Sequence, residues 1–356
     1  MLKKTRLAAA AAAEAPYTPV DADFVLKDNA GEIAIDTNFA AQSFWRDVLV
    51  RYLRKTSAVI GLVLILLISI MAAVGPGMNG YTYSGQELSQ KNLAPRVKIL
   101  EDYGIFDGSE TMNTTTGSKK VNYYEEKELD DVYYWFGSDN FGRDIWTRTW
   151  SGARVSLIIA VAAAIIDMVI GMSYGLISGY FGGRVDMVMQ RILEVANGIP
   201  RLVIVTLLLL VLQPGMLTII FALMLTEWVG MSRIARAEML KLKEQEFVLA
   251  SRTLGAGSFF IIFREVLPNI IGPIITQVMF SIPTAIFTEA FLSFVGLGIP
   301  VPQCSLGSLI SEGFNSFTTH PYQIVPPIVV MALLMLSFNL VADGLREALD
   351  PKMKEM

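Results

Sequence analysis

Long apolar blocks constrain the fold of this chain more than any other feature of its sequence. Residues 58–74 and 266–288 carry no charged side chain. A block of about 18 or more apolar residues is typical of a membrane-spanning helix. Four further blocks of this kind lie at 155–181, 187–212, 216–231 and 321–342. One soluble core would have to bury all of them, so the sequence predicts an all-α polytopic membrane protein with six transmembrane helices.

The content of charged residues agrees with this prediction. They make up 17% of the 356 residues, against about 25% in soluble domains. The chain has one cysteine, Cys304, and one histidine, His320. A single cysteine cannot form a disulfide within the chain, and neither residue has the spacing of a metal site. We therefore expect both to be ordinary loop residues, and we expect no metal site.

The distribution of lysine and arginine predicts the orientation in the membrane. Eight of these residues lie in the N-terminal segment through Lys55, six lie in 232–268, and none lies in 298–320. Such residues accumulate in short cytoplasmic loops. We therefore expect both termini and 232–268 in the cytoplasm, and 76–152 and 298–320 outside the cell.

The same pattern divides the chain into successive parts. We expect, in order, a cytoplasmic tail at 1–45, a first transmembrane helix at 46–75, an extracellular insert at 76–152, a five-helix core at 153–346 that includes 232–268, and a cytoplasmic tail at 347–356. The block at 187–212 begins with polar residues and Pro200, which predicts a kinked or partly interfacial start.

A charged segment within 232–268 separates two of the apolar blocks. Residues 239–254 have a helical period, which places on one face Leu240, Phe247, Ala250 and Leu254. Gly255 and Gly257 then predict a turn. Residues 258–267 are expected to form a second short helix that Pro268 stops. An amphipathic helix on the membrane surface and a docking helix for a partner protein both fit this pattern.

This segment resembles the cytoplasmic EAA signature of ABC importer permeases. The match rests on Ala250, Gly255, Leu267 and Pro268, whereas Leu249 stands in place of the signature Glu and Ser251 in place of its second Ala. Three further stretches resemble the dipeptide and oligopeptide branch of that family: GSDNFGRDIWTRTWSGARVSL (137–157), EAFLSFVGLGIPVP (289–302) and FNLVADGLREALDP (338–351). The insert, with KILEDYGIFDGSE, resembles the C-type oligopeptide permease subunit of Gram-positive bacteria.

The resemblance implies the type I ABC importer permease fold and an ATP-driven uptake of oligopeptides. The implied partners are a second homologous permease subunit, two ATPase subunits and an extracellular peptide-binding lipoprotein, in the plasma membrane of a Gram-positive bacterium. The sequence has no GxxxxGK[ST] phosphate loop, so this chain is not expected to be an enzyme, and ATP and Mg²⁺ are expected in the ATPase subunits. The implied ATPase-coupling residues are Glu246, Phe247, Ala250, Ser251, Gly255, Ala256, Leu267 and Pro268.

Three carboxylates lie at membrane depth: Asp167, Glu227 and Glu289. Each costs about 2.5–3.5 kcal/mol at a helix centre, so each is either hydrogen-bonded between helices or part of a transport pathway. We take Asp167, Glu289 and Ser293 as pathway candidates, and we place Glu227 near the end of its helix.

Other functions remain open at this point. Within the same family, the chain could transport dipeptides or nickel chelates. An ion-coupled secondary transporter is the main alternative from a different class, and it would use the intramembrane carboxylates as coupling sites.

Overall fold

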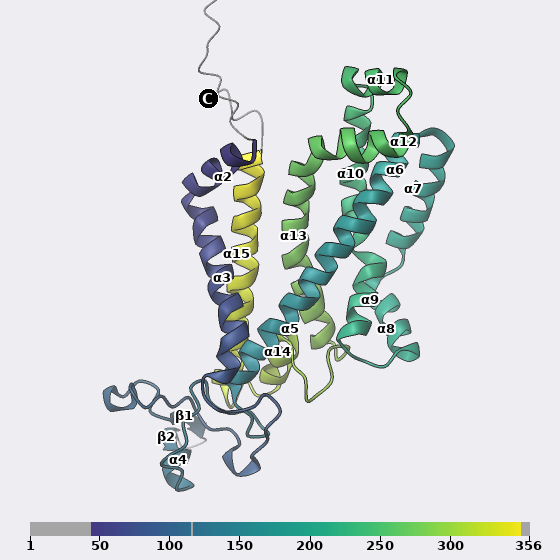
Figure 1. The fold of residues 1–356 in the computed structure, drawn as a ribbon. Helices are drawn as coiled ribbons and strands as arrows, with labels where there is room; N and C mark the ends of the chain where they lie inside the picture. Colours follow the sequence, from purple (N-terminus) through teal and green to yellow (C-terminus); the bar gives the residue numbers. More distant parts are fainter. Residues whose placement is uncertain (1–43, 115–116, 350–356) are drawn as a thin grey trace, which may run out of the picture. The chain divides into compact units, whose positions relative to one another are not determined.

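The computed structural model describes residues 44–114 and 117–349. Residues from Asp47 onward form one compact unit, whose arrangement is shown in Figure 1. The tail expected at 1–45 lies almost entirely outside the described residues, and so does the part of the C-terminal tail from residue 350 onward.

Long helices dominate this unit, as the apolar blocks predict. In the described part of the chain, five helices are long and apolar enough to cross a membrane, and a bent pair adds a sixth. They are Thr56–Gly77 (α3 and η2), Ile145–Phe181 (α5 to α6), Met216–Leu242 (α9 and α10), Ser258–Phe294 (α12 to α13), Pro321–Leu349 (η7 and α15), and the pair Gly183–Gly198 with Leu202–Val211. The bent pair turns by 81° at Pro200, where a kinked start is predicted.

The individual helices have the following bounds: α2 Phe44–Arg54, α3 Thr56–Val74, α4 Tyr123–Glu126, α5 Ile145–Ile166, α6 Met172–Phe181, α7 Gly183–Gly198, α8 Arg201–Val211, α9 Met216–Thr226, α10 Trp228–Leu242, α11 Glu246–Thr253, α12 Ser258–Phe260, α13 Leu267–Phe294, α14 Leu306–Asn315 and α15 Val325–Leu349. Two π-helical segments, η5 at Asp167–Gly171 and η6 at Ile261–Val266, lie within the long helices. Short 3-10 turns lie at Gly75–Gly77 (η2), Leu88–Gln90 (η3), Glu101–Tyr103 (η4) and Pro321–Gln323 (η7).

The second long helix begins ten residues before the apolar block at 155–181. Asp144 caps it, because its carboxylate accepts a hydrogen bond from the Thr147 backbone N–H at 2.8 Å. Such a cap satisfies a backbone donor that the first helical turn leaves unpaired. The helix therefore includes the polar stretch with Arg148, which apolar periodicity alone does not assign to it.

The prediction that Pro268 stops a short helix is wrong. The helix continues from Ser258 to Phe294, and Pro268 lies in the first turn of α13. Proline lacks a backbone donor and its ring clashes with the carbonyl four residues earlier. Here the wider π turn of η6 precedes it directly, and local π adjustments of this kind let a helix accommodate proline.

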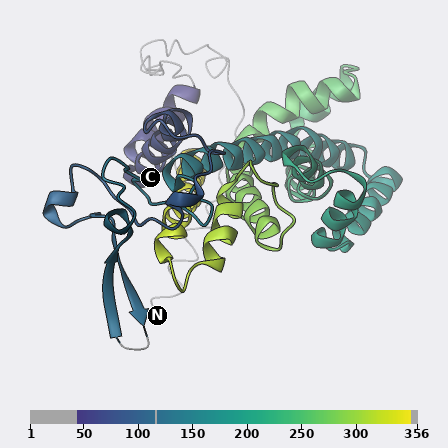
Figure 2. The same cartoon turned by 90° about the horizontal axis from the view of Figure 1, so that it is seen from below.

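The insert after the first long helix contains a small domain. Strands β1 (Ser109–Thr114) and β2 (Gly117–Asn122) form an antiparallel hairpin with Ser109 opposite Asn122, and Figure 2 shows it extending away from the helices. Leu93, Tyr124 and Tyr134 form the buried core of this domain. The loop expected at 298–320 holds the helix α14, whose N-terminus is closed by a capping box between Ser305 and Ser308.

The two larger buried clusters among the helices show how the described part of the chain is packed. The larger joins α3, α5, α9, α13 and α15 and includes Ile159, Ile286 and Leu334. The second joins α6, α10, α11 and the start of α13 and includes Met239 and Val248. The expected charged segment 232–268 is therefore packed onto the second cluster.

Candidate functional site

The segment with the coupling candidates is built as two helices and not as one. The prediction of a single helix over 239–254 is wrong, because α10 ends at Leu242 and α11 begins at Glu246. Between them, the Lys243 N–H still bonds to the Met239 carbonyl oxygen at 2.9 Å, whereas Gln245 has an extended backbone with φ −72° and ψ 150°. The break allows α11 to take its own direction, which Figure 1 shows at the upper end of α10.

One residue of α11, Val248, packs into the core. Val248 is fully buried in the second cluster, where Ile261 and Ile262 are also members. Phe247 and Leu254, which the helical period places on one face with Leu240 and Ala250, are 39% and 88% exposed. The predicted apolar face is therefore the outer face of this segment, and one valine anchors the helix.

Gly255 lies just after α11 and has a left-handed backbone conformation. Its φ is +84°, a conformation that side chains other than glycine rarely adopt. The Ala256 N–H bonds back to the Ser251 carbonyl oxygen at 3.0 Å, and Ala256 packs against the second cluster. A Cβ added at Gly255 meets no atom within 4 Å, so backbone conformation and not space is what requires glycine here.

The remaining coupling candidates are distributed over two places. Glu246, Phe247, Ala250 and Ser251 lie on α11, and of these only Ser251 is partly buried. Leu267 packs against the second cluster, and Pro268 is exposed at the start of α13. Three exposed phenylalanines that the sequence analysis did not single out follow the Gly255 turn: Phe259, Phe260 and Phe263. Their spacing on a helix that follows a charged segment is the signal that would have found them.

Glu289 and Ser293, two of the pathway candidates, are in contact with each other. The Ser293 hydroxyl donates to Glu289 Oε1 at 2.8 Å, and the Ser156 hydroxyl donates to Oε2 at 3.2 Å. The Leu306 N–H in turn donates to Ser156 Oγ at 3.2 Å. Glu289 is fully buried. This carboxylate therefore links α5, α13 and the start of α14, as a hydrogen-bonded structural group does.

Asp167, the third pathway candidate, lies at the first residue of the π segment η5 and is 1% exposed. Its Oδ1 atom has no hydrogen-bond partner. Glu227 is partly buried at the junction of α9 and α10. Asp167 and Glu227 thus both lie where the regular α-helix is interrupted, at a π-helical segment and at a junction between two helices.

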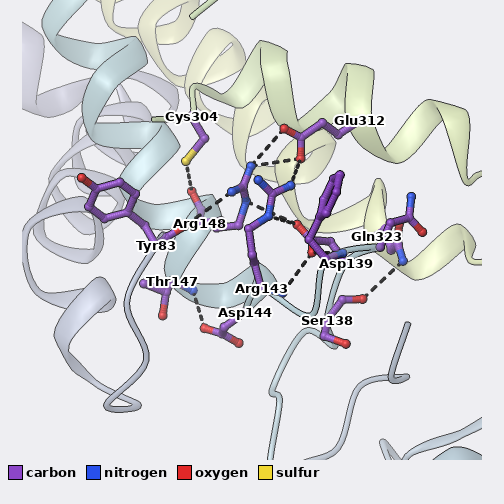
Figure 3. A network of polar contacts seen from close by, with 12 residues as sticks. Tyr83, Ser138, Asp139, Arg143, Asp144, Thr147, Arg148, Cys304, Glu312 and Gln323 are labelled. Atoms are coloured by element: carbon purple, nitrogen blue, oxygen red, sulfur yellow. Dashed lines mark hydrogen bonds and ion pairs between the residues drawn. The ribbon is translucent and has the colours of Figure 1, made fainter. Parts of the chain in front are cut away.

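Two buried arginines form a polar network at the opposite end of the helices from α11, at the start of α5, which sequence reasoning missed (Figure 3). Arg143 and Arg148 both donate to Glu312 of α14, and Arg143 also donates to Asp139 at 2.6 Å. Cys304 lies beside them, with Sγ 3.4 Å from the Arg148 carbonyl oxygen. His320, expected to be an ordinary loop residue, is instead buried with Nδ1 2.9 Å from Glu110 Oε2 of the hairpin.

Comparison with known proteins assigns the chain to a family. The family described as "Binding-protein-dependent transport system inner membrane component" matches residues 171–355. The family described as "N-terminal TM domain of oligopeptide transport permease C" matches residues 43–95.

Relatives match over nearly the whole chain. The oligopeptide transport system permease protein OppC of Bacillus subtilis is 40% identical over 313 residues, which cover 88% of this chain and 91% of that protein. The dipeptide transport system permease protein DppC of the same bacterium is 39% identical and covers 93% of each. Among solved structures, an inward-facing form of the MetNI methionine ABC transporter has a TM-score of 0.49 at 16% identity, covering 57% of this chain and 96% of that one. With its long apolar helices, this chain belongs to the inner membrane components of binding-protein-dependent transport systems, in the branch of the C-type oligopeptide and dipeptide permeases.

Proposed function

We propose that this chain is the permease subunit of an ATP-driven importer for oligopeptides. In this role it forms half of the translocation pathway with a second homologous permease, and it binds two ATPase subunits that hold ATP and Mg²⁺. An extracellular peptide-binding lipoprotein delivers the substrate. Membership of the family and the peptide permeases among the relatives support this proposal.

The observation that carries the coupling role is the apolar outer surface of α11 and α12. Phe247 and Leu249 of α11, Leu254 directly after it and Phe259 of α12 are exposed there. Glu246 and Arg252 lie on α11 as well. Exposed apolar side chains are unfavourable in water, and charges are unfavourable in hydrocarbon. A partner protein can cover the apolar side chains and also offer polar contacts to the charged ones. We therefore assign ATPase docking to Glu246, Phe247, Ala250, Ser251, Gly255, Ala256, Leu267 and Pro268.

The packing of α10 on α6 supports a route by which docking acts on the pathway. A Cβ at Gly175 would lie 2.2 Å from the Ser232 carbonyl oxygen, and one at Gly179 would lie 2.9 Å from Met239 Cβ. Backbones in such close contact should move together. A displacement of α11 therefore passes through α10 and α6 to α5. ATP acts on this equilibrium only if the ATPases bind its two states differently.

The position of α11 and of the insert at opposite ends of the helices supports an orientation in the membrane. In Figure 1, α11 and the C-terminal end of α15 lie at one end of the helices, and the insert lies at the other. We propose that the former end is cytoplasmic, with both termini, and that the insert is extracellular, in the plasma membrane of a Gram-positive bacterium.

A charge placed on the outer surface of α11 tests this function. Leu254→Glu should reduce recovery of the ATPase subunits in a mild-detergent pull-down about tenfold or more, which corresponds to about 1.4 kcal/mol. Uptake of labelled peptide should fall with it, while membrane insertion stays normal. Leu88→Glu is the matched control, because Leu88 is 65% exposed in the insert. Normal uptake by Leu254→Glu would show that the surface does not couple the ATPases.

Substrate length and energy source need a second experiment. In proteoliposomes with all partners, uptake of a labelled hexapeptide should require ATP, and dipeptides should compete weakly. Strong competition by dipeptides would move the assignment to a dipeptide permease. ATP-independent uptake driven by a proton gradient would instead indicate a secondary transporter.

A further inference from the structure

The polar network at the start of α5 contains two buried arginines that share one carboxylate. Arg143 is 2% exposed and Arg148 is fully buried. The Arg143 guanidinium donates to Glu312 Oε2 at 2.7 Å, and that of Arg148 donates to both Glu312 oxygens at 3.1 and 3.0 Å. Two buried guanidinium groups thus converge on one carboxylate, as Figure 3 shows.

The two carboxylates of the network are held differently. Asp139 accepts from the backbone N–H groups of Phe141 and Arg143 at 2.9 and 3.0 Å, in addition to the Arg143 side chain. It is therefore fixed by its own turn. Glu312 comes from α14, and its side chain is 34% exposed. Of the two, Glu312 is the one that can rotate into solvent without breaking a backbone contact.

A cavity lies beside these groups. Its volume is about 140 Å³, and its wall includes Arg143, Arg148 and Glu312. Phe141 and Asn315 also line it and are exposed, so the cavity reaches from the surface to the buried arginines. Arg148 Nε has no hydrogen-bond partner, and Asp139 Oδ2 lies 3.7 Å from it. A buried donor of a charged group without a partner is costly, and a ligand oxygen would satisfy it.

We propose that this cavity is a carboxylate-binding site in which Glu312 occupies the place of the ligand. An incoming carboxylate takes the hydrogen bonds of Arg143 and Arg148 in the two-pronged geometry that guanidinium groups favour, and Glu312 turns outward. The two arginines then face Asp139 and the ligand, so the buried charge stays balanced. We assign the ligand as the C-terminal carboxylate of a peptide, and this part of the assignment rests on the proposed function.

The test compares a peptide with its amide on the full chain in lipid nanodiscs, without ATPase partners. Trialanine with a free carboxylate should bind at least tenfold more tightly than trialanine amide, as measured by calorimetry. Glu312→Gln removes the competing charge and should tighten trialanine several-fold without changing the amide. Arg148→Gln should abolish the difference. Glu101→Gln is the matched control, because it alters a separate ion pair, with Arg96, inside the insert.

The outcomes separate the parts of the proposal. Equal binding of trialanine and its amide, in the wild type and in Glu312→Gln alike, would overturn the site and leave a purely structural network. Acetate that binds where trialanine does not would keep the carboxylate site and overturn its assignment to peptides. If Arg148→Gln does not fold, Glu312→Gln alone decides. Because no ATPase takes part, failure of the docking function does not affect the result.

Discussion

The Asp186 carboxylate accepts two hydrogen bonds from the Arg236 guanidinium, at 2.6 Å to Oδ1 and 2.5 Å to Oδ2. The pair joins α7 to α10, and the Ser178 hydroxyl of α6 donates to the same carboxylate. The helices α6, α7 and α10 are thus joined at one carboxylate. A bidentate arginine–carboxylate pair fixes geometry as well as charge, so it should keep α6, α7 and α10 together as one body.

Breaking this pair should destabilise the protein measurably. Asp186→Asn loses a charge-assisted bidentate contact between partly buried groups, so we expect a loss of about 1–2 kcal/mol and a lower melting temperature in detergent. Arg236→Lys should cost a similar amount, because lysine cannot form the two parallel bonds. Glu194→Gln is the control on the same helix: its pair with Arg191 is exposed and should contribute almost nothing. Equal melting temperatures for Asp186→Asn and Glu194→Gln would show that the pair of Asp186 with Arg236 does not stabilise the protein.

The contact of α6 with α10 depends on the absence of a side chain at Gly175. An added Cβ would lie 2.2 Å from the Ser232 carbonyl oxygen and 2.8 Å from Ala235 Cβ. We expect Gly175→Ala to cost about 1–3 kcal/mol through overpacking, with loss of the monodisperse peak in gel filtration at raised temperature. Gly230→Ala is the matched control on α10, since its Cβ would meet no atom within 4 Å. Equal thermal stability of the two variants would show that the helices can separate at little cost.

The sequence predicts the long helices well, because a bilayer demands apolar blocks of a set length. It predicts their ends poorly. Asp144 starts α5 through a local cap, and η6 lets the helix pass Pro268. Both effects depend on local backbone geometry, which apolar periodicity does not report.

The candidate functional residues likewise divide into those that a local sequence pattern indicates and those that only the fold brings together. The segment around Gly255 is visible in the sequence because its turn and charges are local. The contact of Arg148 with Glu312 joins residues 164 positions apart, so no local pattern announces it. The break before Glu246 is not visible in the apolar periodicity either, so the sequence predicts one continuous helix and does not show that Val248 is the residue of α11 that is buried.

Replacements at Glu289 distinguish a structural carboxylate from a pathway group. Gln keeps an oxygen that can accept from Ser156 or Ser293, so Glu289→Gln should retain folding and most of the transport rate. Glu289→Ala leaves both buried hydroxyls without this acceptor, and we expect a loss of about 1–3 kcal/mol for each group left unsatisfied. Thermal stability and peptide uptake measured on both variants decide the question. A well-folded Glu289→Gln that has lost transport would make Glu289 a pathway residue.

The single thiol offers a probe of the contact between α5 and the loop before α14. Cys304 is 2% exposed, and burial raises the pKa of its thiol to about 11. Because the thiolate is the reactive form, alkylation at pH 8 should be at least tenfold slower in the folded protein than after denaturation in SDS. Mass spectrometry of iodoacetamide-treated protein gives both rates. Rapid labelling of the folded chain would show that this contact opens readily.

Acid should loosen the hairpin of the insert through Asp107. Lys120 Nζ donates to its Oδ2 at 2.8 Å, and the Ser109 hydroxyl and backbone N–H donate to its Oδ1. These contacts, the lysine first, lower the pKa of Asp107 to about 2. A carboxyl group whose folded-state pKa is lowered stabilises the fold above its ordinary pKa near 4, and this contribution disappears as the pH falls towards 2.

Cleavage of the insert by pepsin, measured between pH 2 and pH 5, tests this dependence. Wild-type protein should become more readily cleaved at the hairpin as the pH falls through this range. Asp107→Asn, which cannot ionise, should be cleaved more readily than the wild type at pH 5 and about equally at pH 2. Taking the ratio of the two rates at each pH removes the pH dependence of the protease itself. Asp102→Asn, at an exposed position of the same insert, should give a constant ratio to the wild type, and a constant ratio for Asp107→Asn as well would refute the role of this carboxylate.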